Sequence, residues 1–344
     1  MLRVKQLRAG RWFSYLVYDD VSREALVVDP VPGLCDLFEL MTEDADLSVR
    51  AVVETQCHWH RISSARSLHE MFNAPRCLSA AGNHPAAHEA LRDGETLRLG
   101  EESIVAHGAP GISPDAMVLA AEGFALTGNT LLLNGSGALG LPGSCAAKLY
   151  ETTQRIFSSL GDETVVYPAQ DAQGRLFSTL GAERAQGADV AVADRSRFVA
   201  RKQQAPAVVP SAALQRIWTA NRAPERATPG ALSTQDARPD EIAPPPAAEV
   251  VAVEAQGRCK AGTPLLDVRE DFELMVGEIP GAVHAPLSEL GGRLQALEPT
   301  ETLALCAHGN RSAWTARTLS RLGVPTISVA GGLAAWRDAG LEVA

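Results

Sequence analysis

The sequence predicts an α/β protein of two domains. Strand-like and helix-like segments alternate from the N-terminus to about residue 200, and a second such series follows a Pro- and Ala-rich stretch. Alternation of this kind is typical of α/β architecture. The chain has 344 residues, whereas one domain usually has ~100–200.

The N-terminal series begins with strands and helices whose limits the sequence indicates. Residues 12–18 and 25–30 are predicted strands, with turn-forming residues between them. Residues 34–46 form a predicted helix, and residues 49–55 a third strand. A further helix is expected at 62–72.

The composition changes from about residue 203. Residues 211–220 are predicted to form a short helix. Residues 227–248 are rich in Pro and Ala and include Pro244-Pro245-Pro246. Such a segment favours a semi-rigid polyproline II spacer, which extends ~3.1 Å per residue. We therefore place the domain boundary here.

A short loop that begins at Cys306 stands out in the second series. The apolar run at residues 302–305 before it predicts a buried strand, and apolar residues at helical spacing follow it. Cys306 is thus expected at a strand end, facing the N-terminus of a helix, where free backbone N–H groups attract negative charge. With Arg311 nearby, this setting favours a thiolate.

Four motifs in this region resemble rhodanese sulfurtransferases. Cys306 and Arg311 are separated by four residues, as in the rhodanese loop, whereas phosphatases of the same fold have one more residue there. The other motifs are residues 265–270, 277–286 and 331–336. The resemblance implies a rhodanese α/β domain with a central parallel sheet at residues 249–344.

The resemblance also implies roles for single residues. Cys306 would carry a sulfane sulfur as a persulfide, and Arg311 would hold the anionic donor. The remaining loop residues would bind substrate: Ala307, His308, Gly309, Asn310 and Ser312. Asp267 and Arg269 are expected to support the structure, through the loop or through an ion pair with Glu270 or Glu278.

Plainer interpretations exist for several of these residues. Cys306 is alternatively a buried structural thiol, because free cysteine is among the most buried residue types. His308 is alternatively a solvent-exposed loop residue. Cys259 is either a second, resolving thiol or an ordinary packing residue.

Residues 1–226 resemble the metallo-β-lactamase fold, and within it persulfide dioxygenases first and glyoxalase II second. The likeness rests on Val28-Asp29-Pro30, Ala109–Pro114, Leu126–Leu131 and Tyr167–Asp171. It implies an αββα sandwich. Fusions of a persulfide dioxygenase domain to a rhodanese domain have this same domain order.

The metal positions of that family are altered in this sequence. The family motif Thr-His-x-His-x-Asp-His is Thr55–Arg61 here, and of its four ligand positions only His58 keeps the family side chain. The iron ligands of the dioxygenases correspond to Gln56, Ile112 and Asn129, which are poor ligands for a divalent metal. The altered positions together are Gln56, His60, Arg61, Ile112, Asn129 and Gln170. We expect no metal and no other cofactor.

One alternative is an improvised zinc or copper site. Its candidate ligands are Cys57, His58 and His60, with His107 as an optional fourth. Neighbouring side chains at one strand end diverge, however, and they rarely converge on one ion. Ordinary loop residues are the plainer interpretation.

Composition limits the classes of partner. The net charge of −10 disfavours nucleic acid and anionic membrane surfaces. No long apolar run suggests a signal peptide or a membrane span. Six cysteines without paired spacing suit a reducing compartment, so we expect a cytoplasmic protein.

Three hypotheses follow. In the first, Cys306 takes sulfur from thiosulfate or a low-molecular-weight persulfide and passes it to a thiol or cyanide. The N-terminal domain then serves as a non-catalytic scaffold, a homodimer contact or a binding partner. In the second, the chain is a redox or persulfide sensor without turnover. In the third, the N-terminal domain keeps residual persulfide dioxygenase activity.

Overall fold

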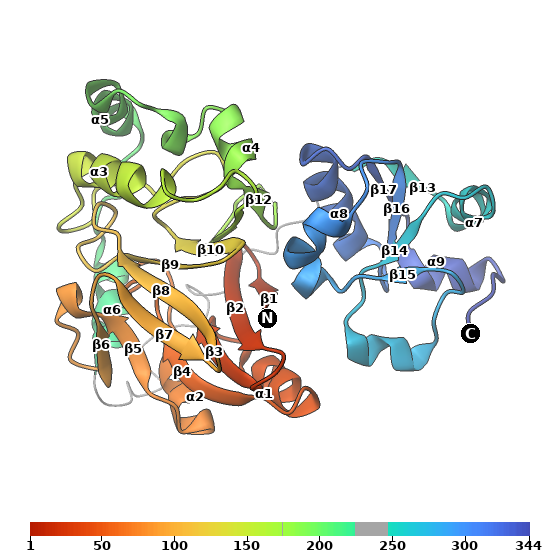
Figure 1. Ribbon diagram of the computed structural model, residues 1–344, viewed down its shortest axis with the longest axis horizontal. Helices are drawn as coiled ribbons and strands as arrows, with labels where there is room; N and C mark the ends of the chain where they lie inside the picture. The colour runs from red at the N-terminus through yellow and green to blue at the C-terminus, as the bar shows by residue number, and fades with distance from the viewer. Residues whose placement is uncertain (174, 224–246) are drawn as a thin grey trace. The chain divides into compact units, whose positions relative to one another are not determined.

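The structure, a computed structural model, describes residues 1–173, 175–223 and 247–344, and these form two compact units (Figure 1). The first unit comprises residues 1–171 with the described part of 179–241, and the second comprises 172–178 with the described part of 242–344. The predicted spacer at 227–248 lies outside the described residues except for its last two positions. Among the described helices, none is long and apolar enough to cross a membrane.

The first unit contains two six-stranded sheets. In the first sheet the strands pair in the order β1-β2-β3-β4-β5-β6, and in the second in the order β12-β11-β10-β9-β8-β7. The first sheet consists of β1 (Leu2–Ala9), β2 (Trp12–Asp19), β3 (Glu24–Val28), β4 (Ser48–Val53), β5 (Arg76–Ser79) and β6 (Glu89–Leu91). The second consists of β7 (Glu95–Leu99), β8 (Glu102–Gly108), β9 (Met117–Ala121), β10 (Phe124–Gly128), β11 (Val165–Pro168) and β12 (Ser178–Thr179).

Aromatic side chains join the two sheets, and helices cover them. Tyr15 of β2 meets Tyr167 of β11 edge to face, with ring centroids 5.5 Å apart. The first sheet shares an apolar core with α1 (Cys35–Asp44) and α2 (Ala65–Phe72). The second shares one with α3 (Ala146–Phe157). The remaining helical elements that precede α6 are η1 (Ala80–Gly82), α4 (Leu180–Ala185), η2 (Asp189–Ala191) and α5 (Arg195–Gln204).

The predicted αββα sandwich is therefore confirmed, and the first elements match the sequence pattern closely. Strands β2, β3 and β4 occupy the three predicted strand segments. Strand β2 is buried along its whole length, which explains why its sequence is mostly apolar at both alternating sets of positions, with Ser14 and Asp19 as polar exceptions.

Helix α6 (Ala212–Arg222) is the last described element of the first unit, and it corresponds to the short helix predicted at residues 211–220. Ser211 caps its N-terminus by accepting a hydrogen bond from the Leu214 N–H. At the other end, the Asn221 amide donates to the carbonyls of His58, at 2.7 Å, and Arg61, at 2.9 Å. These bonds fix the loop that follows β4 against the end of α6.

The second unit is built on a five-stranded sheet whose pairings are all parallel, as predicted. The strand order is β13-β17-β16-β14-β15. Its strands are β13 (Glu249–Val250), β14 (Leu265–Asp267), β15 (Val283–His284), β16 (Thr302–Leu305) and β17 (Thr326–Val329). Its helical elements are α7 (Ala252–Lys260), η3 (Asp271–Val276), η4 (Leu287–Ala296), α8 (Asn310–Arg321) and α9 (Gly332–Asp338).

The two faces of this sheet carry different helices. Leu303, Leu305 and Val329 join an apolar core with α7 and α9. Ser328 faces the other way, because its hydroxyl lies 2.9 Å from that of Ser312 in α8. The strand before Cys306 is thus covered on both faces, and its carboxyl end opens onto the loop that leads into α8.

Candidate active site

The sulfur of Cys306 lies inside a cradle of backbone N–H groups. Strand β16 ends at Leu305, and Cys306 begins the turn into α8. The Gly309 N–H donates to Cys306 Sγ at 3.1 Å, and the Ser312 N–H does so at 3.4 Å. Gly309 caps α8 at φ +91°, a conformation that favours glycine. A sulfur anion at this position gains charge-assisted hydrogen bonds and the field of a helix N-terminus.

Helix α9 holds the same loop from behind. The Leu333 N–H donates to the Cys306 carbonyl at 2.7 Å, and the Ala334 N–H donates to the Ala307 carbonyl at 3.1 Å. Gly331 and Gly332 permit this close approach, since a Cβ on Gly332 would lie 2.1 Å from the Cys306 carbonyl oxygen. The carbonyls of Cys306 and Ala307 are thus hydrogen-bonded to α9, and the N–H groups of Gly309 and Ser312 point toward the sulfur.

The remaining loop residues lie at different depths. Ser312 and Gly309 are buried, and the Ser312 hydroxyl donates to the Gly309 carbonyl at 2.9 Å. His308 and Asn310 are exposed, while Ala307 is half-buried. Cys306 itself is only 1% exposed. His308 and Asn310 are therefore the two loop side chains that an incoming molecule would meet first.

Arg311 forms an ion pair with Glu273 of η3. Its Nη1 lies 2.5 Å from one carboxylate oxygen of Glu273, and its Nη2 lies 2.6 Å from the other. Burial lowers the pKa of Arg311, but Glu273 together with the charges of Cys306 and Glu270 outweighs burial, so this pKa is raised. Burial raises the pKa of Glu273, and the hydrogen bonds from Arg311 and Glu270 reverse that shift. The Arg311 N–H groups that the sequence assigns to an anionic substrate thus donate to Glu273.

Asp267 and Arg269 pair with each other, whereas the sequence left open support of the loop or an ion pair with Glu270 or Glu278. Arg269 is fully buried, and its Nη2 lies 2.5 Å from Asp267 Oδ2. Its guanidinium also donates to the carbonyls of Glu273, at 3.2 Å, and Gly277, at 2.9 Å. Arg269 thereby fixes the segment that carries the partner of Arg311.

Sequence reasoning missed Glu273 and the residues that hold it. Glu270 and Glu273 cap η3 reciprocally, and the Glu270 N–H donates to Glu273 Oε2 at 2.8 Å. Glu270 in turn accepts a hydrogen bond from the Ser288 hydroxyl at 2.7 Å. The part of the capping box that the sequence shows is Glu three positions after the N-cap residue, although Ser or Thr is the usual N-cap residue. That pattern predicts the cap but not the ion pair with Arg311.

Cys259 lies half-buried on α7 and lines a cavity of about 250 Å³ beside Trp336. Burial raises the pKa of its thiol, which favours the unreactive form. These features are those of a packing residue.

In the first unit, the side chains at the family's metal positions do not form a set of metal ligands. Gln56 is buried, and its Oε1 has no hydrogen-bond partner among the described residues. Ile112 packs in an apolar cluster with Leu149 and Phe198. The amide of Gln170 donates to Asn129 Oδ1 at 2.8 Å. Asn129 and Gln170 are thus hydrogen-bonded to each other.

His58 is surrounded by two charged partners. Its Nε2 lies 3.0 Å from Asp29 Oδ1 and 2.9 Å from Nη2 of Arg61. Arg61 is buried, and it donates to the carbonyls of Asp29, at 3.1 Å, and Pro30, at 3.0 Å. Burial raises the pKa of Asp29, but His58, Arg61 and Thr55 outweigh it, so this pKa is lowered. The Arg61 guanidinium is therefore in contact with His58, the one family ligand that this chain retains.

The ligands of the improvised metal site do not converge. Cys57 is buried, and burial raises the pKa of its thiol. Burial lowers the pKa of both His60 and His107. Among the described residues, no group of three or more His, Cys, Asp and Glu side chains is arranged to hold a metal ion.

Comparison with known proteins places both units. The sequence model of the Rhodanese-like domain matches residues 251–339. Human persulfide dioxygenase ETHE1, mitochondrial, is 30% identical over 176 residues, which are 50% of this chain and 68% of that protein. The chain belongs to the persulfide dioxygenase family. It carries a rhodanese-like domain at its C-terminus.

Solved structures agree with this assignment. ETHE1 from Myxococcus xanthus is 27% identical and has a TM-score of 0.59, covering 64% of this chain and 97% of that one. A metallo-β-lactamase from Staphylococcus aureus covers 95% of this chain and 99% of its own, with a TM-score of 0.57. At 17% identity, the second match shows the fold alone.

Within the persulfide dioxygenase family, this chain does not fit the iron that the family implies. A divalent metal site generally needs about three protein ligands. Here the corresponding side chains are a buried amide, an apolar residue and an amide bonded to its neighbour. The Arg61 guanidinium beside His58 adds a fixed positive charge where a cation would have to bind. These side chains are therefore unsuited to hold iron.

Proposed function

We propose that this protein is a sulfurtransferase in which Cys306 carries the sulfur. The observation that carries the proposal is the cradle around Sγ, with N–H donors from Gly309 at 3.1 Å and Ser312 at 3.4 Å. Such a cradle stabilises a thiolate before transfer and a persulfide anion after it. A loop of this size suits a sulfane sulfur better than a phosphate.

The transfer balances without an external oxidant or reductant. The Cys306 thiolate attacks the outer sulfur of thiosulfate, the S–S bond breaks, and sulfite leaves with the electron pair. With a low-molecular-weight persulfide as donor, a thiolate leaves instead. Cyanide or an acceptor thiolate then attacks the outer sulfur of the Cys306 persulfide, and the Cys306 thiolate is released. Ala307, His308, Gly309, Asn310 and Ser312 line the path of the donor.

The direct test is cyanide-dependent formation of thiocyanate from thiosulfate by the full chain. We expect turnover, together with a persulfide on Cys306 that mass spectrometry detects after donor is added and cyanide withheld. A persulfide that forms without any thiocyanate would favour the sensor hypothesis. Absence of both with thiosulfate and with glutathione persulfide would contradict sulfur transfer.

Arg311 is proposed to provide positive charge beside Cys306, with Glu273 setting its position. We expect Arg311→Ala to raise KM for thiosulfate, because it removes that charge and leaves the Glu273 carboxylate to repel an anion. The loss should be about 1.5–3 kcal/mol in kcat/KM, the range of one charge-assisted contact. Arg311→Lys should recover only part, since the planar fork is lost.

Glu273→Gln is the matched variant for Arg311→Ala, and we expect it to change KM for thiosulfate in the opposite direction. It leaves the charge of Arg311 uncompensated and frees its fork, so KM for thiosulfate should fall below that of the unmodified protein. If Arg311 served only to hold the fold, both variants would lower the melting temperature and leave KM unchanged. Steady-state kinetics with calorimetry on the same samples separates these results.

The first unit is proposed to be a non-catalytic relative of persulfide dioxygenases. The set Gln56, Ile112 and Asn129, with Arg61 against His58, supports this proposal. We expect the protein, purified without added metal, to contain no stoichiometric iron or zinc and to consume no oxygen with glutathione persulfide. A chelator should leave its melting temperature unchanged, because folding does not depend on metal. Near one equivalent of iron together with persulfide-dependent oxygen uptake would contradict the proposal.

A restored ligand set provides the converse measurement. The triple change Gln56→His, Ile112→His and Asn129→Asp supplies two imidazoles and a carboxylate, so weak iron binding is expected. Adding Arg61→His should strengthen it, since the guanidinium that contacts His58 is removed. Metal content by mass spectrometry checks both variants.

We also propose a cytoplasmic location for the protein. All six cysteines are free thiols, which suits a reducing compartment.

A further inference from the structure

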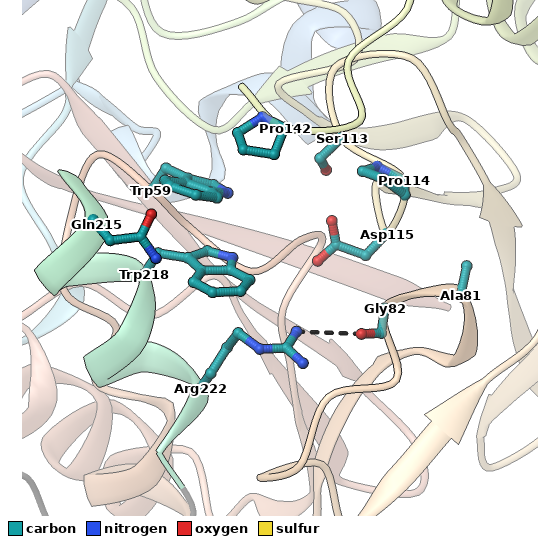
Figure 2. Close-up of a pocket in the computed structure, with 10 residues that line it drawn as sticks. All are labelled: Trp59, Ala81, Gly82, Ser113, Pro114, Asp115, Pro142, Gln215, Trp218 and Arg222. Carbon is teal, nitrogen blue, oxygen red and sulfur yellow. Dashed lines mark hydrogen bonds between the residues drawn. The ribbon is translucent and has the colours of Figure 1, made fainter. Parts of the chain in front are cut away.

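A cavity of about 330 Å³ lies in the first unit, between the loop after β4, the turn at η1, the loop after β8, and helix α6 (Figure 2). Its size is at the small end of the ~300–1,000 Å³ usual for ligand pockets. Two Trp side chains, a carboxylate, a guanidinium and a hydroxyl line it: Trp59, Trp218, Asp115, Arg222 and Ser113. We call it the tryptophan pocket. None of these residues takes part in the proposed sulfur transfer.

One side of the tryptophan pocket is a stack of three planar groups. The rings of Trp59 and Trp218 are stacked, with centroids 4.9 Å apart and an interplanar angle of 21°. The Arg222 guanidinium lies 4.8 Å from the centroid of the Trp218 ring. Figure 2 shows this stack facing Ser113 and Asp115 across the pocket. The stack gives the pocket a rigid apolar surface with a positive charge at one end.

Asp115 brings a buried negative charge to the opposite side. Its side chain belongs to a residue only 8% exposed, and its Oδ2 accepts a hydrogen bond from the Cys57 N–H at 2.7 Å. Among the described residues, no basic side chain forms an ion pair with it. A buried carboxylate without a cationic partner costs free energy unless something else compensates it.

Arg222 is likewise without an acidic partner in the described part of the chain. It donates to the carbonyls of Gly82, at 3.2 Å, and Asn83, at 3.0 Å. These bonds fix the side chain and leave N–H groups of the fork available, because a guanidinium has five donors. One pocket thus presents two opposite charges that do not neutralise each other directly.

Ser113 adds a buried hydroxyl without a partner in the described part of the chain. It is 1% exposed, and its Oγ has no hydrogen-bond partner among the described residues. Buried hydroxyls nearly always have a partner. A hydroxyl of this kind beside two separated charges indicates a pocket shaped for a polar ligand.

We propose that the tryptophan pocket binds a free α-amino acid through its zwitterionic head group. The ammonium group pairs with Asp115 and donates a hydrogen bond to the Ser113 hydroxyl oxygen, while the carboxylate pairs with Arg222. The apolar part of the ligand lies against Trp59 and Trp218. A simple cation would be repelled by Arg222 and a simple anion by Asp115, so a ligand with both charges fits best. Binding involves no covalent step.

The test is a titration of the full-length protein with each proteinogenic L-amino acid, followed by tryptophan fluorescence and by calorimetry. At least one should bind saturably and change the emission, because Trp59 and Trp218 lie in the pocket. The best ligand is then compared with its N-acetyl form, which lacks the ammonium charge, and its amide, which lacks the carboxylate. Each derivative should bind about tenfold or more weakly, as expected for loss of one charge-assisted contact.

Two variants assign the charges. Asp115→Asn should weaken the free amino acid about tenfold or more while leaving the N-acetyl form unaffected. Arg222→Gln should also weaken the free amino acid about tenfold or more, while leaving the amide unaffected. Glu122→Gln and Arg197→Gln change the same charges at exposed positions of this unit and should not alter binding. Melting temperatures verify that every variant folds.

Three results would overturn the proposal. The first is that no amino acid binds. The second is that the N-acetyl form or the amide binds as tightly as the free amino acid, which would mean that the pocket recognises only one charge. The third is that folded Asp115→Asn and Arg222→Gln proteins bind the amino acid unchanged, which would place its site elsewhere.

Discussion

Cys306→Ser is expected to abolish thiocyanate formation while the protein remains folded. A serine hydroxyl cannot carry a sulfane sulfur, and no other cysteine in the chain stands in a comparable loop. The fold should survive because serine is close in size, and it can accept the same N–H bonds from Gly309 and Ser312. The measurements are the rate of thiocyanate formation and the melting temperature.

Cys259→Ser is the matched control for this substitution. Cys259 lies in the same unit, on α7, and it is half-buried. Its replacement should leave both the rate and the persulfide on Cys306 unchanged. A Cys306→Ser protein that still forms thiocyanate at the unmodified rate would remove Cys306 from the mechanism. A Cys259→Ser protein that loses activity would restore the resolving-thiol interpretation.

Local patterns predicted the surroundings of Cys306 well. The apolar run at 302–305 is strand β16, and the following helical spacing is α8. A buried strand, a glycine at positive φ and an amphipathic helix are properties of neighbouring residues, so they are visible in a short stretch of sequence. The same reason explains why β2, β3 and β4 were predicted closely.

The pairing of charged side chains was not predictable in the same way. Arg311 and Glu273 are 38 positions apart in the chain, and their contact depends on how η3 packs against the loop. The sequence suggested that Arg269 supports the loop or pairs with Glu270 or Glu278, and in the structure it pairs with Asp267. Several carboxylates lie near Arg269 in the sequence, and only the folded backbone selects one.

The first unit presents a similar contrast. The loss of metal ligands is readable from residue types alone, since Ile112 has no donor atom. The contact between Arg61 and His58, and the bond between Gln170 and Asn129, required the structure. The tryptophan pocket was missed for the same reason, because Trp59 and Trp218 are distant in sequence and stack only through α6.

Gly332→Ala is expected to have the largest effect on the rhodanese-like unit. A Cβ at this position would lie 2.1 Å from the Cys306 carbonyl oxygen and 2.8 Å from the Gly309 nitrogen. Both neighbours are backbone atoms of the loop, so the loop itself must move. The residue also has φ +59°, which costs an alanine about 1–2 kcal/mol even without a clash. We expect a total loss of about 4 kcal/mol or more, a size that single substitutions rarely reach.

Gly340→Ala separates the clash from the backbone strain. Gly340 has φ +67°, and nothing lies within 4 Å of the position of its Cβ. This control should therefore lose only about 1–2 kcal/mol and keep its activity. In Gly332→Ala the Cys306 carbonyl can no longer accept from the Leu333 N–H, so the N–H groups around Sγ should shift and thiocyanate formation should fall to background. Calorimetry of the full chain and hydrogen exchange of peptides spanning 302–312 measure the two effects. Equal stability and equal activity of the two variants would show that α9 does not hold the loop in place.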